Sequence, residues 1–488
     1  MLSTLRQRFW VVAVLLVGAG LIWSACGGNH SSASTGGSVT TVLSDPATCS
    51  MANGGPYSHV YVTVSDVQAN LSASSNSGWV DLTPGLSSSP KQVDLLAPAD
   101  TECFLATLGD AKQLPAGDYQ QIRVMLLANS SAGSVSGNKC GNSAANCVVL
   151  SSDGSTQTLQ LSSQAQTGIK IPAAQIAGGK LTVANGQAVD LDIDFNSCAS
   201  IVVEGNSMFR LKPVLTAGQV GTQNTSINGT ITDNNGNPIA GNVVVALERV
   251  DATACTGAVS GTCTGIDRVI MQTVPDSSGN FVFCPVPAGT YDVVADAVSS
   301  GNIAYAATVT AGVGPGTALG KIQLLPEPAA PGPQTPVTIT GQITSAGSSG
   351  AAAISGNLAA LQSVTENGNN ILVSVPVPSQ NGVLVPFGTA ASSSSLTCPA
   401  GTDCATYSLI VPAANPDFGQ YNSAGTTYTQ STAPVNYIID GLSDAANACS
   451  SAEQFVTKDS TGATLTVAAS TASVTAQTMA FTGCTPNS

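Results

Sequence analysis

Charged side chains are scarce in this sequence. They make up 9% of its 488 residues, with 14 Lys or Arg against 28 Asp or Glu, and the basic residues nowhere form a cluster. Binding to nucleic acid and adhesion to an anionic membrane surface both need such a cluster, so the sequence argues against both functions. Low charge combined with 43% apolar residues also differs from the composition of a disordered chain.

Histidine is almost absent, because only His30 and His59 occur. The sequence contains no C-x-x-C, H-E-x-x-H or G-x-S-x-G motif and no phosphate-binding glycine loop. These absences argue against zinc sites, metalloproteases, serine hydrolases and nucleotide-binding enzymes. Glycoside hydrolysis by two carboxylates needs no histidine, so a glycoside-active enzyme remains the alternative to a non-enzymatic protein.

No apolar run is long enough for a comfortable membrane span. Residues 1–25 instead predict an export signal, with Arg6 and Arg8 before the apolar segment 9–23. Small residues then lead to Cys26, and this arrangement resembles a bacterial lipobox. The resemblance implies that the Cys26 thiol receives a lipid and becomes the new N-terminus. An ordinary secretory signal is the competing interpretation.

Residues 26–39 are rich in Gly and Ser and predict a flexible tether. Gly27 follows the cysteine, so the Asp that usually signals retention in the inner membrane is missing. We therefore expect a cell-envelope location with a lipid anchor in the outer membrane, and secretion if the anchor is absent.

Twelve cysteines follow Cys26, and an even number suits disulfides in an oxidising compartment. Eight of the twelve suggest four local disulfides: Cys140 with Cys147, Cys255 with Cys263, Cys398 with Cys404, and Cys449 with Cys484. The remaining four, which are Cys49, Cys103, Cys198 and Cys284, require either a bridge between domains or two free thiols.

Short alternating segments separated by turn residues indicate an all-β chain of three tandem antiparallel β-sandwich domains behind the lipoprotein signal peptide. Residues 40–218 form the first domain, in which only 98–113 suggest a short helix. Its segments GWVDLT, VDLL, LPAGDYQQIR, TGIK, LDIDF and LKPV occur in an order that resembles the bacterial lipoprotein family called domain of unknown function 4382. The family implies a β-sandwich-like exported domain and supplies no activity.

Residues 225–325 predict a second sandwich. DNNGNP (233–238) is a turn sequence, and the alternation of Phe281 and Phe283 with Val282 places both rings in one core. With PAGTY (287–291), these features resemble the carboxypeptidase regulatory-like family, which has a transthyretin-type fold. Members are often grouped with carbohydrate-binding-like folds.

The proline-rich segment 326–336 predicts a semi-rigid linker. Beyond it, residues 337–488 predict a second, diverged sandwich of similar type, because TITGQIT (338–344) echoes SINGTIT (226–232).

Three aspartates alternate along one predicted strand face at Asp190, Asp192 and Asp194. One interpretation is a Ca²⁺ site, since calcium prefers oxygen ligands. The other is a solvated face that pairs with basic residues on neighbouring strands. No other cofactor is expected. Asp233 also begins a calcium-loop-like sequence, but the turn interpretation fits it better.

Aromatic residues make up only 5% of the chain, and two of its three tryptophans lie in the signal segment. Sugars usually bind on exposed aromatic rings, and Tyr421 and Tyr428 are the best candidates for such a site. The alternative is that both pack under a loop.

These features together predict a lipid-anchored, non-enzymatic envelope protein that presents β-sandwich modules to a glycan or a protein partner. A purely structural spacer is a further alternative.

Overall fold

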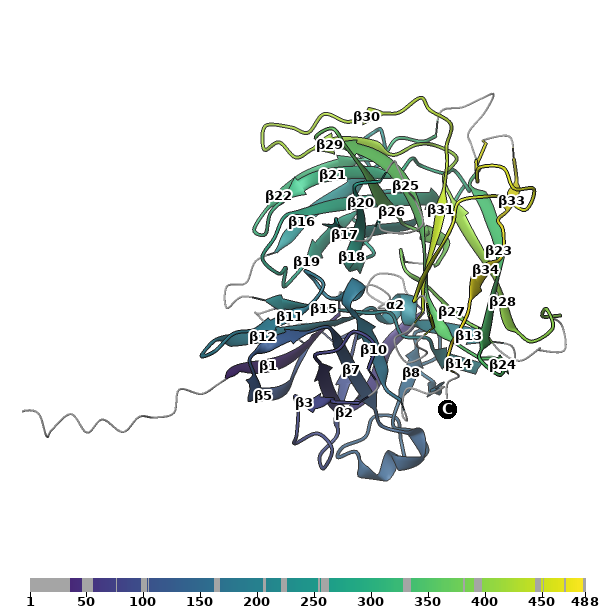
Figure 1. Ribbon diagram of the computed structural model, residues 1–488. Coiled ribbons are helices and arrows are strands. Elements are labelled where there is room, and N and C mark those ends of the chain that lie inside the picture. Colours follow the sequence, from purple (N-terminus) through teal and green to yellow (C-terminus); the bar gives the residue numbers. More distant parts are fainter. Residues whose placement is uncertain are drawn as a thin grey trace, which may run out of the picture.

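The computed structural model describes residues 36–485 except 46–55, 76, 98–102, 104, 162–166, 205–207, 221–225, 253–254, 256–262, 328–334, 381, 390–396, 444–448, 451 and 469–470. The predicted signal segment, Cys26 and Cys49 lie outside the described residues, as do most of the tether and of the 326–336 linker. Nearly all regular structure is β, as Figure 1 shows, so the predicted all-β class is confirmed.

The first module packs two sheets against each other. The smaller sheet consists, in spatial order, of β15 (Leu215–Val220), β12 (Ala188–Phe195), β1 (Gly36–Ser44) and β5 (Ala106–Pro115). The larger sheet consists of β10 (Ile169–Pro172), β7 (Gln121–Leu126), β2 (Tyr57–Asn70), β8 (Cys147–Leu150), β9 (Thr156–Gln160), β14 (Met208–Leu211) and β13 (Ile201–Glu204), with β3 (Val80–Asp81) and β4 (Lys91–Asp94) paired to β2. The remaining elements are the ribbon of β6 (Gly117–Tyr119) and β11 (Leu181–Val183), the helix α2 (Ser197–Ser200), and the 3-10 turns η2 (Asn129–Ser134) and η3 (Ala173–Gln175).

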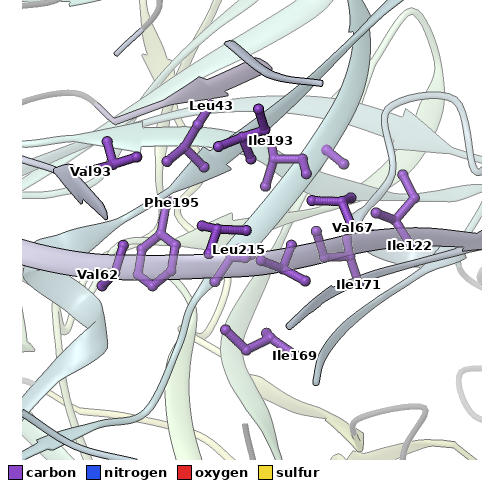
Figure 2. Packing of buried hydrophobic residues seen from close by; sticks show 14 of the residues in the cluster. Leu43, Val62, Val67, Val93, Ile122, Ile169, Ile171, Ile193, Phe195 and Leu215 are labelled. Atoms are coloured by element: carbon purple, nitrogen blue, oxygen red, sulfur yellow. The ribbon is translucent and has the colours of Figure 1, made fainter. Parts of the chain in front are cut away.

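The core of this module lies between its two sheets. Figure 2 shows Phe195 of the smaller sheet beside Val62 of the larger one; Leu43, Ile193 and Ile122 belong to the same buried cluster. On β2 the valines at 60, 62 and 64 share one face and are all buried. Inward-facing β-branched side chains on both sheets therefore build a continuous apolar layer.

A helix was expected over 98–113, and this prediction was wrong for the described part. Residues 106–115 form strand β5, which pairs antiparallel with β1. Its pairing partner is distant in the sequence, so tertiary pairing overrides the local propensity.

The second and third modules each have a sheet of their own. In the second module, β16 (Ile227–Thr232) lies between β19 (Asn280–Phe283) and β22 (Ala318–Gln323). In the third, β23 (Val337–Gly347) pairs with β24 (Gly350–Ala351), β28 (Asp403–Val411), β33 (Ser473–Thr475) and β34 (Met479–Phe481).

These two modules also share an eleven-stranded sheet. Its centre belongs to the second module and consists of β21 (Thr308–Val313), β20 (Tyr291–Ser299), β17 (Gly241–Asp251) and β18 (Gly265–Thr273). The third module supplies β30 (Thr429–Gln430) and β29 (Asp417–Gln420) beyond β21, and β26 (Asn369–Val375), β25 (Ser355–Glu366), β31 (Ile438–Ser443) and β32 (Glu453–Val456) beyond β18. The short strand β27 (Val385–Gly388) pairs with β25, and the 3-10 turn η5 (Pro378–Gln380) lies between β26 and β27.

Parallel pairing makes the two joins, with Gly265–Ile266 beside Ile371–Leu372 and Thr308–Ala311 beside Asp417–Gln420. Valines of both modules form one buried cluster at this shared sheet: Val244, Val269, Val294 and Val309 with Val364, Val373 and Val383. The second and third sandwiches are thus tandem in sequence but continuous in space.

Local predictions for the second module are confirmed. Phe281 and Phe283 are buried with ring centroids 5.6 Å apart, while Val282 between them is half exposed. At the turn, the Asp233 carboxylate accepts hydrogen bonds from the backbone N–H groups of Asn235 and Asn237, and Gly236 has a φ of 82°. A carboxylate used in this way stabilises the turn.

Five disulfides occur among the described residues. Four join the cysteine pairs suggested by their sequence spacing. The fifth joins Cys103 to Cys284 across 181 residues and links the first module to the second. Of the two options left open for the remaining cysteines, the structure therefore contains a bridge between domains.

Replacing Cys103 and Cys284 by Ala should destabilise the chain strongly, because this cross-link closes the longest loop among the described disulfides. We expect a loss of about 5 kcal/mol in the free energy of unfolding, against about 2 kcal/mol for the matched pair Cys398→Ala and Cys404→Ala. Denaturant unfolding measures both values. Equal losses for the two double variants would contradict the role of the link between modules.

Candidate functional site

The two predicted tyrosines lie in one pocket at the join between the second and third modules. Tyr421 and Tyr428, both partly buried, line a cavity of about 300 Å³ together with Thr310 of β21 and Leu319 and Lys321 of β22. We call this cavity the tyrosine pocket. The parallel pairing of β29 with β21 carries the loop 421–428 over the edge of the second module.

Hydrogen bonds hold this loop and one of the rings in place. Tyr428 Oη and Thr310 Oγ1 share a hydrogen bond of 2.8 Å, and burial raises the pKa of the Tyr428 phenol. Within the loop, the Asn422 N–H donates to Thr426 Oγ1 and the Ala424 N–H donates to Asn422 Oδ1. The pocket therefore combines two aromatic rings, one of them held by a hydrogen bond, with hydroxyl and amide groups.

Trp79 is not available as a sugar-binding platform. The Arg123 guanidinium carbon lies 4.3 Å from the centre of its ring, and the Lys170 ammonium nitrogen lies 5.6 Å from it. Both distances are typical of cation–π contacts. The ring therefore serves sheet packing within the first module.

The aspartates of β12 are not on a solvated face. Asp192 and Asp194 are each 4% exposed, while Asp190 is partly buried. Asp194 pairs across the sheet with Thr216, whose hydroxyl donates to the Ile270 carbonyl of β18. For Asp192 and Asp194 the interpretation of a solvated face was therefore wrong, because both are buried and the strand partner of Asp194 contacts the second module.

Two of these carboxyls are instead poised to be protonated. Burial raises the pKa of Asp192 to about 7, although Ser44 Oγ donates to its carboxylate at 2.9 Å. Burial and repulsion from Asp192 also hold the pKa of Asp194 well above its usual range. Within the described ranges, no group of three or more His, Cys, Asp or Glu side chains is arranged to hold a metal ion. Calcium binding by Asp190, Asp192 and Asp194 remains an untested prediction.

The shared sheet contains a second group of buried carboxyls, which we call the seam acids. Glu248, Asp267 and Asp292 lie on the adjacent strands β17, β18 and β20, and each is at most 4% exposed. Glu248 and Asp292 are direct cross-strand partners. Like charges in this arrangement repel, so the carboxyls cannot all ionise at low cost. Sequence reasoning missed this group, although an acid directly after the apolar run 243–247 was a usable signal.

The third module covers the seam acids with polar contacts. Glu248 Oε2 accepts a hydrogen bond of 3.0 Å from the Ser374 N–H, and the Ser374 hydroxyl donates to the Asp267 carbonyl at 2.9 Å. Nearby, Arg268 Nη1 binds Asp440 Oδ2 at 2.6 Å and Nη2 binds Glu453 Oε1. Residues distant in sequence thus form one polar network.

Protonation of the seam acids is favoured in the folded state. Burial is the largest cause of the raised pKa of Glu248 and Asp267, and it raises the pKa of Asp292 to about 6. Outside this group, burial also raises the pKa of Asp440 to about 7, although the Arg268 guanidinium opposes the shift. A pKa above the unfolded value means that the folded chain holds the proton more tightly. The stabilisation is complete below pH about 4 and is lost as the pH rises through 6 to 7.

Comparison with known proteins identifies one family match. Residues 36–213 match the model of the family described as domain of unknown function (DUF4382). This match confirms the resemblance inferred for the first module. No curated protein matches the sequence.

Several solved structures are similar over parts of the chain. The Bacillus anthracis TIE protein shares 10% identity over 92% of this chain and 50% of its own, with a TM-score of 0.15, so this chain spans half of its length. A streptococcal ancillary pilin shares 12% identity over 81% of this chain and 96% of its own, with a TM-score of 0.16. The shaft pilin SpaA from Lactobacillus rhamnosus GG shares 10% identity over 61% and 100%, also with a TM-score of 0.16. Scores this low carry no argument about function.

Within the part of the chain that the structure describes, no helix is long and apolar enough to cross a membrane.

The seam acids predict a pH-dependent stability. Between pH 5 and pH 8 the free energy of unfolding of the wild-type chain should fall. Asp267→Asn removes one buried carboxyl, so it should stabilise the chain at pH 8 by about 1–3 kcal/mol and change it little at pH 5. Denaturant unfolding at both pH values measures this.

Asp118→Asn is the matched control. Asp118 is exposed and pairs with Lys180 at 2.7 Å, and its pKa is lowered, so its loss should leave the slope between pH 5 and pH 8 unchanged. If the free energy of unfolding of the wild-type chain were the same at pH 5 and pH 8, the seam acids would ionise at no cost and the prediction would be contradicted.

Proposed function

We propose that the chain is an exported, lipid-anchored, non-enzymatic envelope protein whose β-sandwich modules bind carbohydrate. The tyrosine pocket carries this proposal. Its two aromatic rings offer apolar faces for sugar C–H groups, while Thr310, Asn422 and Lys321 offer hydrogen-bonding groups beside them.

The composition of the tyrosine pocket favours binding over hydrolysis. None of the described residues that line it is an acid, a cysteine or a histidine. A glycosidase of the usual kind would need two carboxyls at its cleavage site. Recognition without turnover is therefore the function we assign to this pocket.

Assignment of residues 225–325 to the carboxypeptidase regulatory-like family is part of the proposal. The turn at Asp233 and the paired rings of Phe281 and Phe283 support it. So does the Tyr291 hydroxyl, which donates to the Pro287 carbonyl at 2.6 Å and fixes the PAGTY turn. A transthyretin-type sandwich at this place would serve as the platform on which the loop 421–428 rests.

Screening the purified full chain on a glycan array should give saturable binding to a defined set of saccharides. Tyr421→Ala and Tyr428→Ala should each weaken that binding at least about tenfold, because each removes an apolar ring face. Tyr428→Phe should retain most of it, since the ring remains and only the bond to Thr310 is lost. Calorimetry with the best saccharide gives the affinities.

Tyr61→Ala is the matched control, because this partly buried tyrosine stacks on His59 in the first module, away from the pocket. Binding should survive in this variant. Glycan binding that is equally strong in the Tyr421→Ala and Tyr428→Ala variants would place the site elsewhere, and release of a sugar product would refute the non-enzymatic role.

Lipid attachment predicts a second result. Wild-type chain expressed in a bacterial host should incorporate radiolabelled fatty acid and fractionate with membranes, whereas Cys26→Ala should do neither, because acylation requires the thiol. Cys398→Ala serves as the control for loss of a cysteine. Unchanged labelling of the Cys26→Ala chain would rule out this anchor.

A further inference from the structure

A larger cavity lies where all three modules meet. It has a volume of about 650 Å³. The first module lines it with Ala173, Ala174, Ile176, Gly178 and Gly179, the second with Arg249, Asp251 and Arg268, and the third with Glu453. We call it the junction cleft. Its size suits a small ligand, and sites of this kind occur preferentially between domains.

Two arginines face each other across neighbouring strands in the junction cleft. Arg249 of β17 and Arg268 of β18 are direct register partners. Like charges directly opposite are destabilising unless they are compensated. Arg268 is compensated within the fold, because Asp440 and Glu453 bind its guanidinium.

Arg249 has no such compensation. Among the described residues, no carboxylate lies within ion-pair distance of its guanidinium, and that group makes no hydrogen bond. The chain carries twice as many acids as basic residues, so an uncompensated arginine inside a cleft is unexpected. A planar guanidinium with free donors recognises carboxylates and other oxyanions in a two-pronged geometry.

The surroundings restrict where this guanidinium can lie. A methyl group built on Gly178 would lie 3.6 Å from Arg249 Nη1, and one built on Gly289 would lie 3.4 Å from Cζ. The nearby Tyr291 phenol is fixed by its bond to Pro287. The guanidinium therefore sits between two turns rather than on a free surface, which lowers the entropy cost of binding an anion.

Two acidic residues of the junction cleft restrict which other chemical groups the ligand can have. Asp251 and Glu453 line the cleft beside Arg249 and are hydrogen-bond acceptors. They would repel a multiply charged anion but accept hydrogen bonds from hydroxyl groups. A ligand with one carboxylate and several hydroxyls satisfies both conditions.

We infer that the junction cleft binds an acidic sugar, with a uronate carboxylate on Arg249 and sugar hydroxyls toward Asp251 and Glu453. This site is separate from the tyrosine pocket and does not depend on the function proposed for that pocket.

Calorimetry on the purified full chain tests the inference with a galacturonate trisaccharide, the neutral galactose trisaccharide and inorganic phosphate as probes. We expect the galacturonate probe to bind in a way that depends on Arg249, whereas phosphate should not bind, and any binding of the neutral trisaccharide should not depend on Arg249. Arg249→Gln should weaken it at least about tenfold, because a charge-assisted bidentate contact is lost. Arg249→Lys should restore only part of the affinity, since an ammonium lacks the planar fork.

Arg210→Gln is the matched control, because it removes one arginine charge from β14 in the first module and should leave galacturonate binding unchanged. Tyr421→Ala should also leave it unchanged, which separates this site from the tyrosine pocket. Thermal unfolding of each variant verifies that the fold is intact.

Three results would overturn the inference. They are absence of galacturonate binding by the wild-type chain, unchanged affinity for galacturonate in Arg249→Gln, and tighter binding of phosphate than of galacturonate.

Discussion

The shared sheet is the constraint on which the other features depend. Strands of the third module pair with both outer strands of the second module's sheet, β18 and β21. Pairing satisfies backbone donors and acceptors that an open edge would expose, and it removes a template for aggregation. Both edges of the second module's sheet are therefore covered by strands of the third module. The polar groups at these two contacts are buried as a consequence.

Several carboxyl groups are buried at these contacts between modules, although the chain has few charged residues. Glu248, Asp267 and Asp292 meet beneath β26, and Asp192 and Asp194 meet where the first module contacts β18. A lone ionised carboxylate in such a place is costly, so protonation substitutes for a counter-ion. Arg268 is the exception, where a cation holds Asp440 and Glu453 together. Mildly acidic solution therefore lowers the cost of burying the carboxyls that have no counter-ion, whereas the ion pairs of Arg268 need ionised partners.

Features that depend on neighbours in sequence were predictable. The alternation around Val282, the turn at Asp233 and the closely spaced cysteine pairs need only local geometry. Features that depend on distant pairing were not. The strand at 106–115 forms by pairing with β1, and Asp194 is buried near the contact with β18. The bridge from Cys103 to Cys284 forms only when the first two modules lie side by side. Tyr421 and Tyr428 were recognised as candidates from composition, but their common pocket arises only from the pairing of β29 with β21.

The tyrosine pocket and the junction cleft both lie between modules rather than within one. The tyrosine pocket needs β22 of the second module and the loop 421–428 of the third, and the junction cleft needs all three modules. A β-sandwich fills its own interior with side chains, so concave surface arises mainly where sandwiches meet. Both sites are therefore formed only when the modules assemble, because each is lined by residues of more than one module.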